Sequence, residues 1–268
     1  MPRIETTFYQ LIDTLKTADR VLAFGKTGGA ALPDDGFSDI DLFVFCDCLP
    51  SKTERAALYA SVSADLCVSE YGETEDPHWG LVDSLLIGRQ EVYPMYFSQD
   101  AFLTSIDSIL RGERTQRENN YFYPTGRCAS ILGMHVFFDP QGLISSLKKQ
   151  CVSYPDALRS AVLAGNLPKI DDSEDFQRAV LRGDVLFYHA TIDSALDHFL
   201  QALFALNRVY FPSRKRSLDY LRGFSLKPAD CEFRLLQALR LGADAETLAE
   251  SYGIWHQMCF ELQLLSGD

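Results

Sequence analysis

The spacing of apolar residues near the N-terminus predicts a helix followed by two strands. Residues 5–18 carry apolar side chains three and four positions apart, which predicts an amphipathic helix. Two short apolar runs follow, at residues 21–24 and 39–46, and both are typical of buried strands. The segment between them is rich in Gly, Pro and Asp, so a loop is predicted to begin at Gly25.

Strands and helices alternate in the next part of the chain. Residues 80–98 contain two β-rich runs around a Gly-Arg pair, which predicts a hairpin. Because Pro94 lies in the second run and has no backbone N–H, that strand is predicted to be an edge strand or to bulge. The other elements predicted here are a helix at 53–64, a strand near 66–69, a helix at 98–111, a loop at 112–128 and a short strand within 131–142.

Beyond residue 142 the apolar positions recur at helical spacing almost everywhere. The longest such segment runs from Ser173 to about Tyr210, and two more helices are predicted at 230–241 and 245–265. We therefore expect an α+β fold with two domains. A mixed sheet with flanking helices is predicted for residues 1–141, followed by a helical bundle at 142–268.

Composition and charge narrow the range of partners. Hydrophobic residues make up 47% of the chain, enough for a sizeable core, and the formal net charge of -12 argues against binding nucleic acid through its phosphates. The sequence has no run of 18 apolar residues and no signal-peptide pattern at its start, so we expect a cytoplasmic protein without a membrane segment. The seven cysteines are scattered without a CxxC pair, which favours reduced thiols over disulfides or a zinc site.

Two carboxylates begin the second predicted strand, Asp39 and Asp41. Side chains two positions apart on a strand share a face, so both carboxylates are expected to point the same way. Two carboxylates held close together repel each other, and a hard divalent cation relieves that repulsion. Mg²⁺ typically takes one or two carboxylates together with substrate phosphates, and a second Mg²⁺ ion could join the site. Asp39 and Asp41 are therefore the predicted metal ligands.

The predicted loop before this strand has the residues of an anion site. Gly25 allows a close backbone approach, and successive N–H groups can cradle a phosphate. Lys26, Thr27 and Ser38 would add a charge and two hydroxyls. The glycine pair at positions 28 and 29 is an alternative start for this loop.

These two features together resemble the signature of the polymerase-β-like nucleotidyltransferase superfamily. That signature is a glycine-containing turn, a spacer, and Asp-hydrophobic-Asp-hydrophobic, which residues 38–42 (SDIDL) match. The family often has Gly-Ser where this chain has Gly25-Lys26, so the resemblance is closer for the metal ligands than for the phosphate contacts. It implies Mg²⁺, ATP or another nucleoside triphosphate, and transfer of the nucleoside monophosphate.

The same resemblance implies a third carboxylate on a neighbouring strand. Glu91 in the stretch GRQEV fits the family pattern and is the candidate, both as a metal ligand and as the general base on the attacking hydroxyl. Asp83, on the partner strand of the hairpin, is the alternative.

The helical half is similar in layout to the C-terminal domains of nucleotidyltransferases that act on aminoglycosides and lincosamides. In such enzymes a helix carboxylate contacts the acceptor, which implies Asp193 or Asp197 here, four residues apart and so on one helix face. A downstream Lys contacts the nucleotide, which implies Lys215 between two arginines.

The function expected from these features is transfer of a nucleoside monophosphate to a hydroxyl of a small-molecule acceptor, such as an aminoglycoside- or lincosamide-like compound. Two alternatives stay open: nucleotidylation of a protein or tRNA, as in toxin–antitoxin systems, and a degenerate nucleotide-binding module without catalysis. The acidic net charge speaks against tRNA, and the intact Asp-x-Asp speaks against the degenerate module. The sequence says nothing of oligomeric state.

Overall fold

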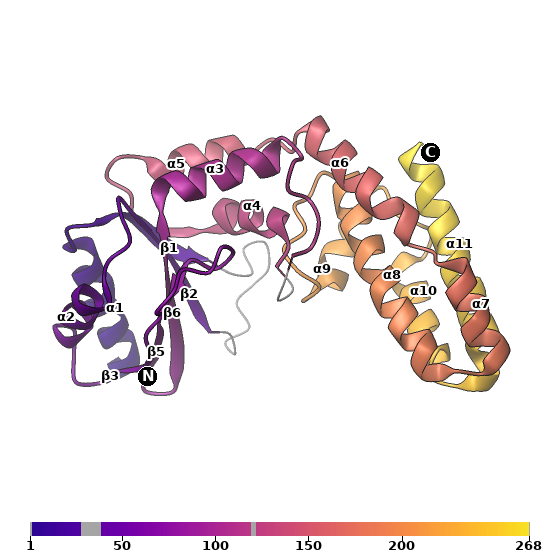
Figure 1. The fold of residues 1–268 in the computed structure, drawn as a ribbon, viewed down its shortest axis with the longest axis horizontal. Helices are drawn as coiled ribbons and strands as arrows, with labels where there is room; N and C mark the ends of the chain where they lie inside the picture. The colour runs from indigo at the N-terminus through magenta and orange to yellow at the C-terminus, as the bar shows by residue number, and fades with distance from the viewer. Residues whose placement is uncertain (1, 28–38, 119–121, 268) are drawn as a thin grey trace. The chain divides into compact units, whose positions relative to one another are not determined.

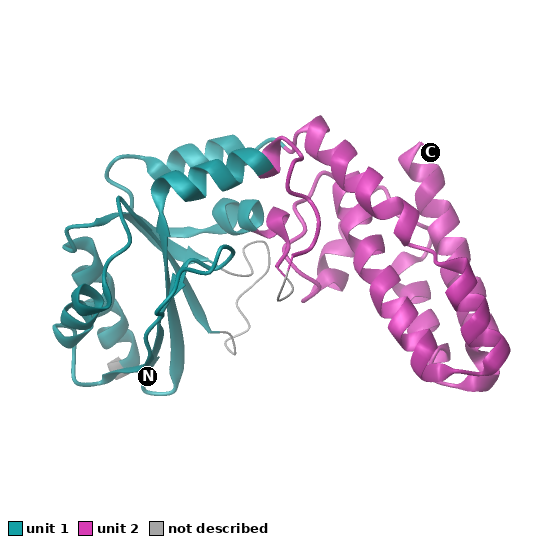
Figure 2. Ribbon diagram, in the orientation of Figure 1, with its two compact units in different colours: residues 1–108, 127–153 teal, residues 109–126, 154–268 magenta. Residues whose placement is uncertain are grey.

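A computed structural model describes residues 2–27, 39–118 and 122–267. The chain forms two compact units, shown in Figure 2. The first, the sheet unit, contains residues 1–108 and 127–153. The second, the helical unit, contains residues 109–126 and 154–268. The predicted α+β fold, a mixed sheet with flanking helices followed by a helical part, is confirmed.

The sheet unit is built on a mixed sheet (Figure 1). The strands lie in the order β3-β5-β6-β2-β1-β7, and β4 pairs with β6. All the neighbouring pairs in the described sheet are antiparallel except β2 and β6, which are parallel. The strands are β1 (Val21–Thr27), β2 (Ile40–Cys46), β3 (Leu66–Glu70), β4 (Leu81–Val82), β5 (Ser84–Ile87), β6 (Gln90–Ser98) and β7 (His135–Phe138).

Each face of this sheet has its own apolar layer, because side chains alternate along the strands. On one face Leu42 and Val44 pack with Leu11 and Leu15 of α1 in a core that also includes residues of α2. On the other face the Phe43, Phe45 and Phe97 rings lie against Phe102 of α3, with Phe102 4.8 Å from Phe45 between ring centroids. The helices of this part are α1 (Pro2–Lys16), α2 (Lys52–Ala60), α3 (Gln99–Leu110), α4 (Pro124–Gly133) and α5 (Leu143–Cys151).

The helical unit is centred on α8, most of which is buried. Phe199 of α8 lies 5.2 Å from Trp255 of α11 between ring centroids, and the Trp255 indole N–H donates to the Ile170 carbonyl. No helix in the part of the chain that the structure describes is both long enough and apolar enough to cross a membrane. The helices here are α6 (Asp156–Asn166), η2 (Leu167–Lys169), α7 (Ser173–Arg182), α8 (Val185–Leu206), α9 (Ser217–Leu221), α10 (Cys231–Leu241), η3 (Ala245–Thr247) and α11 (Leu248–Ser266).

Pro94 was predicted to mark an edge strand or a bulge, and the edge-strand alternative is wrong. β6 lies inside the sheet, between β5 and β2. The Pro94 carbonyl accepts from the Asp83 N–H, so the Pro94 nitrogen faces the same side of its strand. On that side the neighbouring strand is broken between β4 and β5. The N–H that Pro94 lacks therefore does not interrupt a continuous row of backbone hydrogen bonds.

Two element boundaries also differ from prediction. The long apolar segment after Ser173 is two helices, because Gly183 takes the left-handed conformation (φ 62°) and the Asp184 carboxylate caps α8 by accepting from the Phe187 N–H at 3.0 Å. Residues 112–128 are not all loop, since α4 begins at Pro124. The contacts place residues 143–153 with the sheet and 109–126 with the helices, whereas the predicted division lies at residue 142.

Candidate functional site

Three polar side chains form a row on the face of the sheet that carries α3. Thr27 of β1 is paired with Asp41 of β2, and Asp41 is paired with Tyr93 of β6. Paired residues on adjacent strands share a face, so the three side chains project from the same side. Their neighbours Leu42 and Val92 point to the opposite, apolar side.

A second pair of acidic residues continues this row at the start of the strands. Asp39 immediately precedes β2, and Glu91 is the second residue of β6. Both are exposed, whereas Asp41 is half-buried. Because Ile40 pairs with Val92 in parallel register, Asp39 and Glu91 come next to each other along the two strands. Asp39, Asp41 and Glu91 therefore share one face at one end of β2 and β6.

Tyr93 lies two residues after Glu91 on β6, so the two side chains share a face of the sheet. Desolvation, followed by the charge of Glu91, raises the pKa of Tyr93, and the charge of Asp39 adds to the effect. The phenol therefore stays protonated at neutral pH.

Thr27 has an unusual hydroxyl. The side chain is 5% exposed, and its Oγ1 makes no hydrogen bond within the described ranges. An unsatisfied buried hydroxyl costs about 1–3 kcal/mol, so a native structure that keeps one calls for an explanation. A phosphate or water oxygen delivered by a ligand would satisfy it.

The carboxylates do not form a closed metal site by themselves. No group of three or more His, Cys, Asp and Glu side chains among residues 2–27, 39–118 and 122–267 is arranged to hold a metal ion. Asp39, Asp41 and Glu91 thus share a face without completing a ligand set. Two carboxylates still suit Mg²⁺, which commonly completes its coordination with water and substrate phosphates.

Gly25 and Lys26 lie differently from what their proposed phosphate contacts require. β1 continues through both residues to Thr27, so neither belongs to a loop. A Cβ on Gly25 would come within 2.6 Å of the His135 carbonyl and of Met134 Cγ, so packing against β7 explains the glycine. Lys26 is paired with Leu42 and faces the opposite side of the sheet from Asp41. Ser38 and the alternative glycine pair at 28 and 29 lie outside the described residues.

Asp83, the alternative third carboxylate, is held by other partners on the opposite face. It is fully buried, accepts from Arg55 Nε at 2.8 Å and from the Tyr59 hydroxyl at 2.7 Å, and accepts from the Gly72 N–H at 2.9 Å. Arg55 and Tyr59 belong to α2, which covers the face away from Asp41. Of the two candidates, only Glu91 lies on the face of the sheet that carries Asp39 and Asp41.

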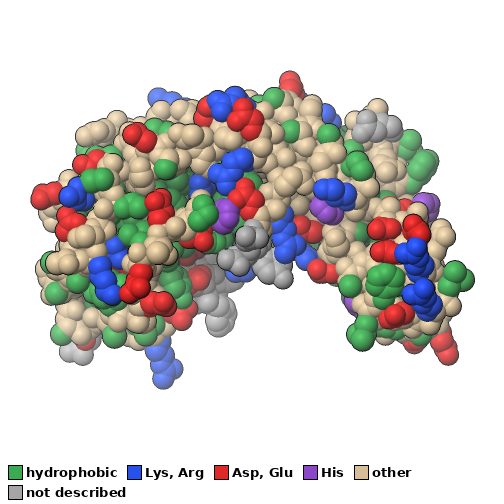
Figure 3. Space-filling view, viewed as in Figure 1, with side chains coloured by type: hydrophobic (Ala, Val, Ile, Leu, Met, Phe, Trp, Pro, Cys, Tyr) green, Lys and Arg blue, Asp and Glu red, His purple; other side chains and the backbone are tan. Residues whose placement is uncertain are grey.

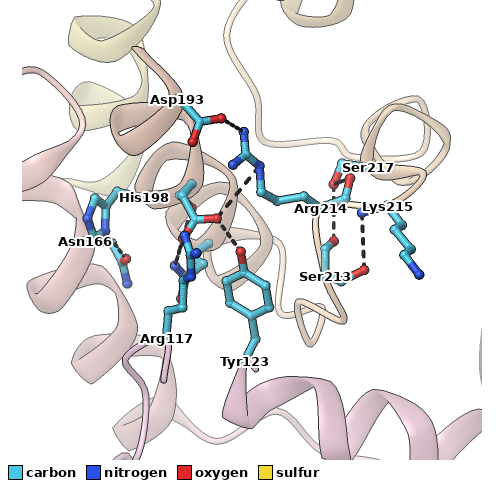
Figure 4. Close-up of polar contacts among 11 residues, drawn as sticks. Arg117, Tyr123, Asn166, Asp193, His198, Ser213, Arg214, Lys215 and Ser217 are labelled. Atoms are coloured by element: carbon cyan, nitrogen blue, oxygen red, sulfur yellow. Dashed lines mark hydrogen bonds and ion pairs between the residues drawn. The ribbon is translucent and has the colours of Figure 1, made fainter. Parts of the chain in front are cut away.

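The helical unit has its own polar cluster around Asp197 of α8 (Figure 4). Asp197 is buried and accepts from the Tyr123 hydroxyl and from Gln201 Nε2 at 3.2 Å. The guanidinium groups of Arg117 and Arg214 lie 3.7 and 3.9 Å from its carboxylate. Burial and this carboxylate raise the pKa of Tyr123. The partners of Asp197 are therefore supplied by its own unit.

Asp193 and Lys215 are the more accessible members of the predicted substrate contacts. The Asp193 side chain is 63% exposed and accepts from Arg214 Nη2 at 2.6 Å, which lowers the pKa of Asp193 and raises that of Arg214. The Lys215 backbone N–H donates to Ser213 Oγ at 3.2 Å, while its exposed side chain points away from Arg214 in Figure 4. Within the described chain the Lys215 ammonium makes no ion pair.

His198 is a polar residue whose arrangement the sequence did not reveal. Its Nδ1 lies 2.8 Å from Asn166 Oδ1, and Asn166 Nδ2 donates to the Val162 carbonyl at 2.7 Å. The amide oxygen must therefore accept, so His198 Nδ1 carries a proton. Burial, followed by the positive charge of Lys169, lowers the pKa of His198.

Tyr93, in contrast, could have been found from the sequence, because strand alternation puts it on the same face as Glu91.

Comparison with known proteins gives limited matches. A family model described as a domain of unknown function (DUF4037) matches residues 123–216. No curated protein matches the chain. Among solved structures, a nucleotidyltransferase-like protein from Exiguobacterium sibiricum is similar, with 13% sequence identity and a TM-score of 0.45, over 98% of this chain and 73% of that one. At this identity and TM-score, the likeness bears on neither site nor substrate.

Proposed function

We propose that the protein is a metal-dependent nucleotidyltransferase that transfers a nucleoside monophosphate, in the first instance from ATP, to a hydroxyl of a small acceptor. The observation that carries this proposal is the row of Thr27, Asp41 and Tyr93, with Asp39 and Glu91 on the same face. This face combines two acidic residues suited to a metal ion, a buried hydroxyl that has no hydrogen-bond partner among the described residues, and a third carboxylate.

The residues present fit a bound Mg²⁺–nucleotide. Asp39 and Asp41 would hold the cation, with the phosphates supplying further oxygen ligands. The unsatisfied Thr27 hydroxyl supports the same assignment, because it can donate to a phosphate oxygen or to a bound water. When bound, Mg²⁺ would neutralise charge that develops on the phosphates. Thr27 thus replaces Gly25 and Lys26 as the described residue of β1 best placed for the nucleotide.

Glu91 is the proposed general base. Its carboxylate takes the proton from the acceptor hydroxyl, the resulting oxygen bonds to the α-phosphorus, and the bond from that phosphorus to the bridging oxygen of pyrophosphate breaks. The products are the nucleotidylated acceptor and pyrophosphate, and the proton remains on Glu91 until it passes to solvent. Glu91 is exposed, so acceptor and solvent can both reach it.

Taken by itself, the helical unit offers Lys215 and Asp193 as accessible charged side chains. The exposed Lys215 ammonium suits a phosphate, and its neighbour Arg214 is already paired with Asp193. For a cationic acceptor, such as an aminoglycoside, Asp193 is the better candidate of the two aspartates. The Asp193 side chain is exposed and pairs with Arg214, which a cationic acceptor could replace. The Asp197 side chain is buried and already has several polar partners.

A polynucleotide acceptor is less well supported by the surface. On the face shown in Figure 3, basic side chains lie among acidic ones. The net charge of -12 also opposes the phosphate contacts that hold nucleic acids. Protein nucleotidylation and simple nucleotide binding without transfer are the outcomes that compete with a small acceptor.

The proposal is tested by incubating the protein with Mg²⁺, α-labelled ATP or another nucleoside triphosphate, and a panel of aminoglycosides and lincosamides. We expect a nucleotidylated small product, and a loss of about 100-fold or more in Asp39→Asn and Asp41→Asn, as for removal of a main charge-stabilising group. The same variants should lose Mn²⁺ binding in an electron paramagnetic resonance titration. Asp65→Asn, an exposed aspartate of the sheet unit, is the matched control.

Three results would count against the proposal in different ways. Label on protein and none on any small acceptor would favour protein nucleotidylation. Mn²⁺ and nucleotide binding that depend on Asp41, without any transfer, would indicate a binding module. Binding and product formation unaffected by either aspartate substitution would eliminate the metal site altogether.

A further inference from the structure

Helix α11 of the helical unit, yellow in Figure 1, has an exposed face that carries no charge. Its inner face packs against other helices of the unit: Trp255 lies against Phe199 of α8, and Tyr252 stacks on Phe176 of α7 with 4.9 Å between ring centroids. The residues on the opposite side are exposed and recur three or four positions apart, so they share one face. These residues, here called the outer stripe, are Ala249, Gly253, Gln257, Phe260 and Leu264.

The composition of the outer stripe is unusual for the solvent side of a helix. A helix at the surface typically presents charged or polar side chains to water. The outer stripe instead has one amide and no ionisable group, and its Phe260 and Leu264 side chains are 55% and 60% exposed. Because the chain has a net charge of -12, two copies repel each other, and the repulsion is smallest where uncharged faces meet. The outer stripe is therefore a face on which a second copy can bind.

Gly253, in the middle of the outer stripe, is not explained by the packing of its own unit. Glycine inside a helix is destabilising relative to alanine. A Cβ on Gly253 would meet no atom of the described chain within 4 Å, so nothing there excludes a side chain. The contrast is Gly126 of α4, where a Cβ would lie 2.8 Å from the Pro212 carbonyl oxygen. The bare backbone at Gly253 leaves room for a close approach by a group from outside the unit.

The sizes of the side chains along the outer stripe fit a second copy of α11 that runs in the opposite direction. The small residues Ala249 and Gly253 lie toward one end, and the large residues Phe260 and Leu264 lie toward the other. If Phe260 of one copy lies opposite Gly253 of the second copy, Leu264 lies opposite Ala249, because both pairs of residues are four apart. One register thus places every large side chain on a small one, as in helices that pack ridges into grooves.

We propose that two copies of this protein associate through the outer stripe, with their α11 helices antiparallel about a two-fold axis beside Gln257. A two-fold contact needs a face that is complementary to itself, and the small and large ends of the outer stripe meet that requirement. The stripe is about 22 Å long from Ala249 to Leu264, at a rise of about 1.5 Å per residue. One helix face of this length is smaller than the interface of a stable complex, so we expect a weak dimer with a Kd of roughly 10–100 µM.

Sedimentation velocity of the full chain, at concentrations below and above this range, tests the contact. We expect the mass of the wild type to rise from 30.1 kDa toward twice that value. Gly253→Leu should raise the Kd of the dimer at least about tenfold, because the new side chain takes the place of Phe260 of the second copy. The monomer should stay folded by circular dichroism, since leucine favours a helix more than glycine does and has open space at this position.

Two further variants complete the design. Phe260→Ala should also raise the Kd at least about tenfold. Its matched control is Val152→Ala, which truncates an exposed valine of the sheet unit and should leave the Kd unchanged. Combining Gly253→Leu with Phe260→Ala exchanges the large and the small position, so the Kd should return to within about fivefold of the wild type.

Several results would overturn the inference. One is a wild type that stays monomeric throughout the concentration range. Another is a Gly253→Leu chain that associates as strongly as the wild type or more strongly, because a non-specific apolar patch would behave in that way. A double variant that associates no better than Gly253→Leu would contradict the pairing of Phe260 with Gly253. The readout is mass and not activity, so the outcome is independent of the proposed function.

Discussion

Thr27 and Asp41 are paired across β1 and β2, which places a buried hydroxyl without a hydrogen-bond partner in the described structure next to a half-buried carboxylate. The pairing follows from the antiparallel register of the two strands, in which Gly25 is opposite Phe43 and Thr27 opposite Asp41. Both residues are thus carried by strands inside the sheet, since β1 lies between β7 and β2, and β2 lies between β1 and β6. A site built there is held more precisely than one built on a loop.

Replacing Thr27 by valine should separate folding from nucleotide binding. Valine has the same shape and removes the unsatisfied hydroxyl, so the free energy of unfolding should stay equal or rise by up to about 1 kcal/mol. The affinity for Mg²⁺–ATP should fall about tenfold, the effect of losing one hydrogen bond to a charged group. Urea unfolding and calorimetry measure the two quantities.

Thr125→Val is the matched control for this substitution. Thr125 is also 5% exposed, but its hydroxyl donates to the Phe211 carbonyl at 2.9 Å. Its loss should lower the free energy of unfolding by about 1–2 kcal/mol. A similar loss in Thr27→Val would show that the Thr27 hydroxyl already has a partner in the free protein.

Gly25→Ala should destabilise the sheet unit. The added Cβ would meet the His135 carbonyl and Met134 at 2.6 Å, and the carbonyl is backbone that cannot rotate away. We expect the free energy of unfolding to fall by about 1–3 kcal/mol, as for other overpacked sites. Gly253→Ala, inside α11 with no atom within 4 Å of the new Cβ, should instead raise it by about 0.5–1 kcal/mol. A neutral Gly25→Ala would contradict the close packing of β1 against β7.

Asp83 and Glu91 should respond in opposite ways to loss of their charge. Asp83→Asn leaves Arg55, 2% exposed, without its buried counter-charge, so the free energy of unfolding should fall by about 3–5 kcal/mol. Glu91→Gln should cost less than about 1 kcal/mol of stability, because the side chain is exposed, but should abolish most of the transfer activity. Thermal or urea unfolding, measured together with the activity assay, distinguishes the structural role of Asp83 from the catalytic role of Glu91. A stable Asp83→Asn without activity would move the third carboxylate to Asp83.

His198 should make the helical unit less stable in mild acid. Burial and the nearby Lys169 lower its folded-state pKa, so the unfolded chain binds the proton at a higher pH than the folded chain does. The contribution to stability is therefore complete above the unfolded-state pKa and is lost as the pH falls through the folded-state pKa. Between pH 7.5 and 5, the free energy of unfolding should decrease less steeply in His198→Gln than in the wild type. Parallel curves from urea unfolding would rule out this role of His198.

Much of the local structure could be read from the sequence, because it depends on neighbours along the chain. The alternation in residues 39–46 predicted a strand with its carboxylates on one face, and the structure has β2 there, with Leu42 and Val44 in the core on the other face. The change to helical spacing near residue 142 predicted the helical part. The Asp-x-Asp pair could be found because its geometry is set within three residues.

Other features depended on which strands lie side by side, and local periodicity carries little information on that. From the sequence, Pro94 suggests an edge strand, whereas the structure places the break between β4 and β5 opposite it, at Asp83. Gly25 suggests a phosphate-binding loop, whereas the structure packs β7, more than a hundred residues later, against it. The sequence by itself thus determined the elements, the α+β class and the shared face of Asp39 and Asp41. Only the tertiary structure decided that Asp83 faces α2, that Lys26 faces away from Asp41, and that Tyr93 lies beside Asp41, because strand pairing between distant segments sets these positions.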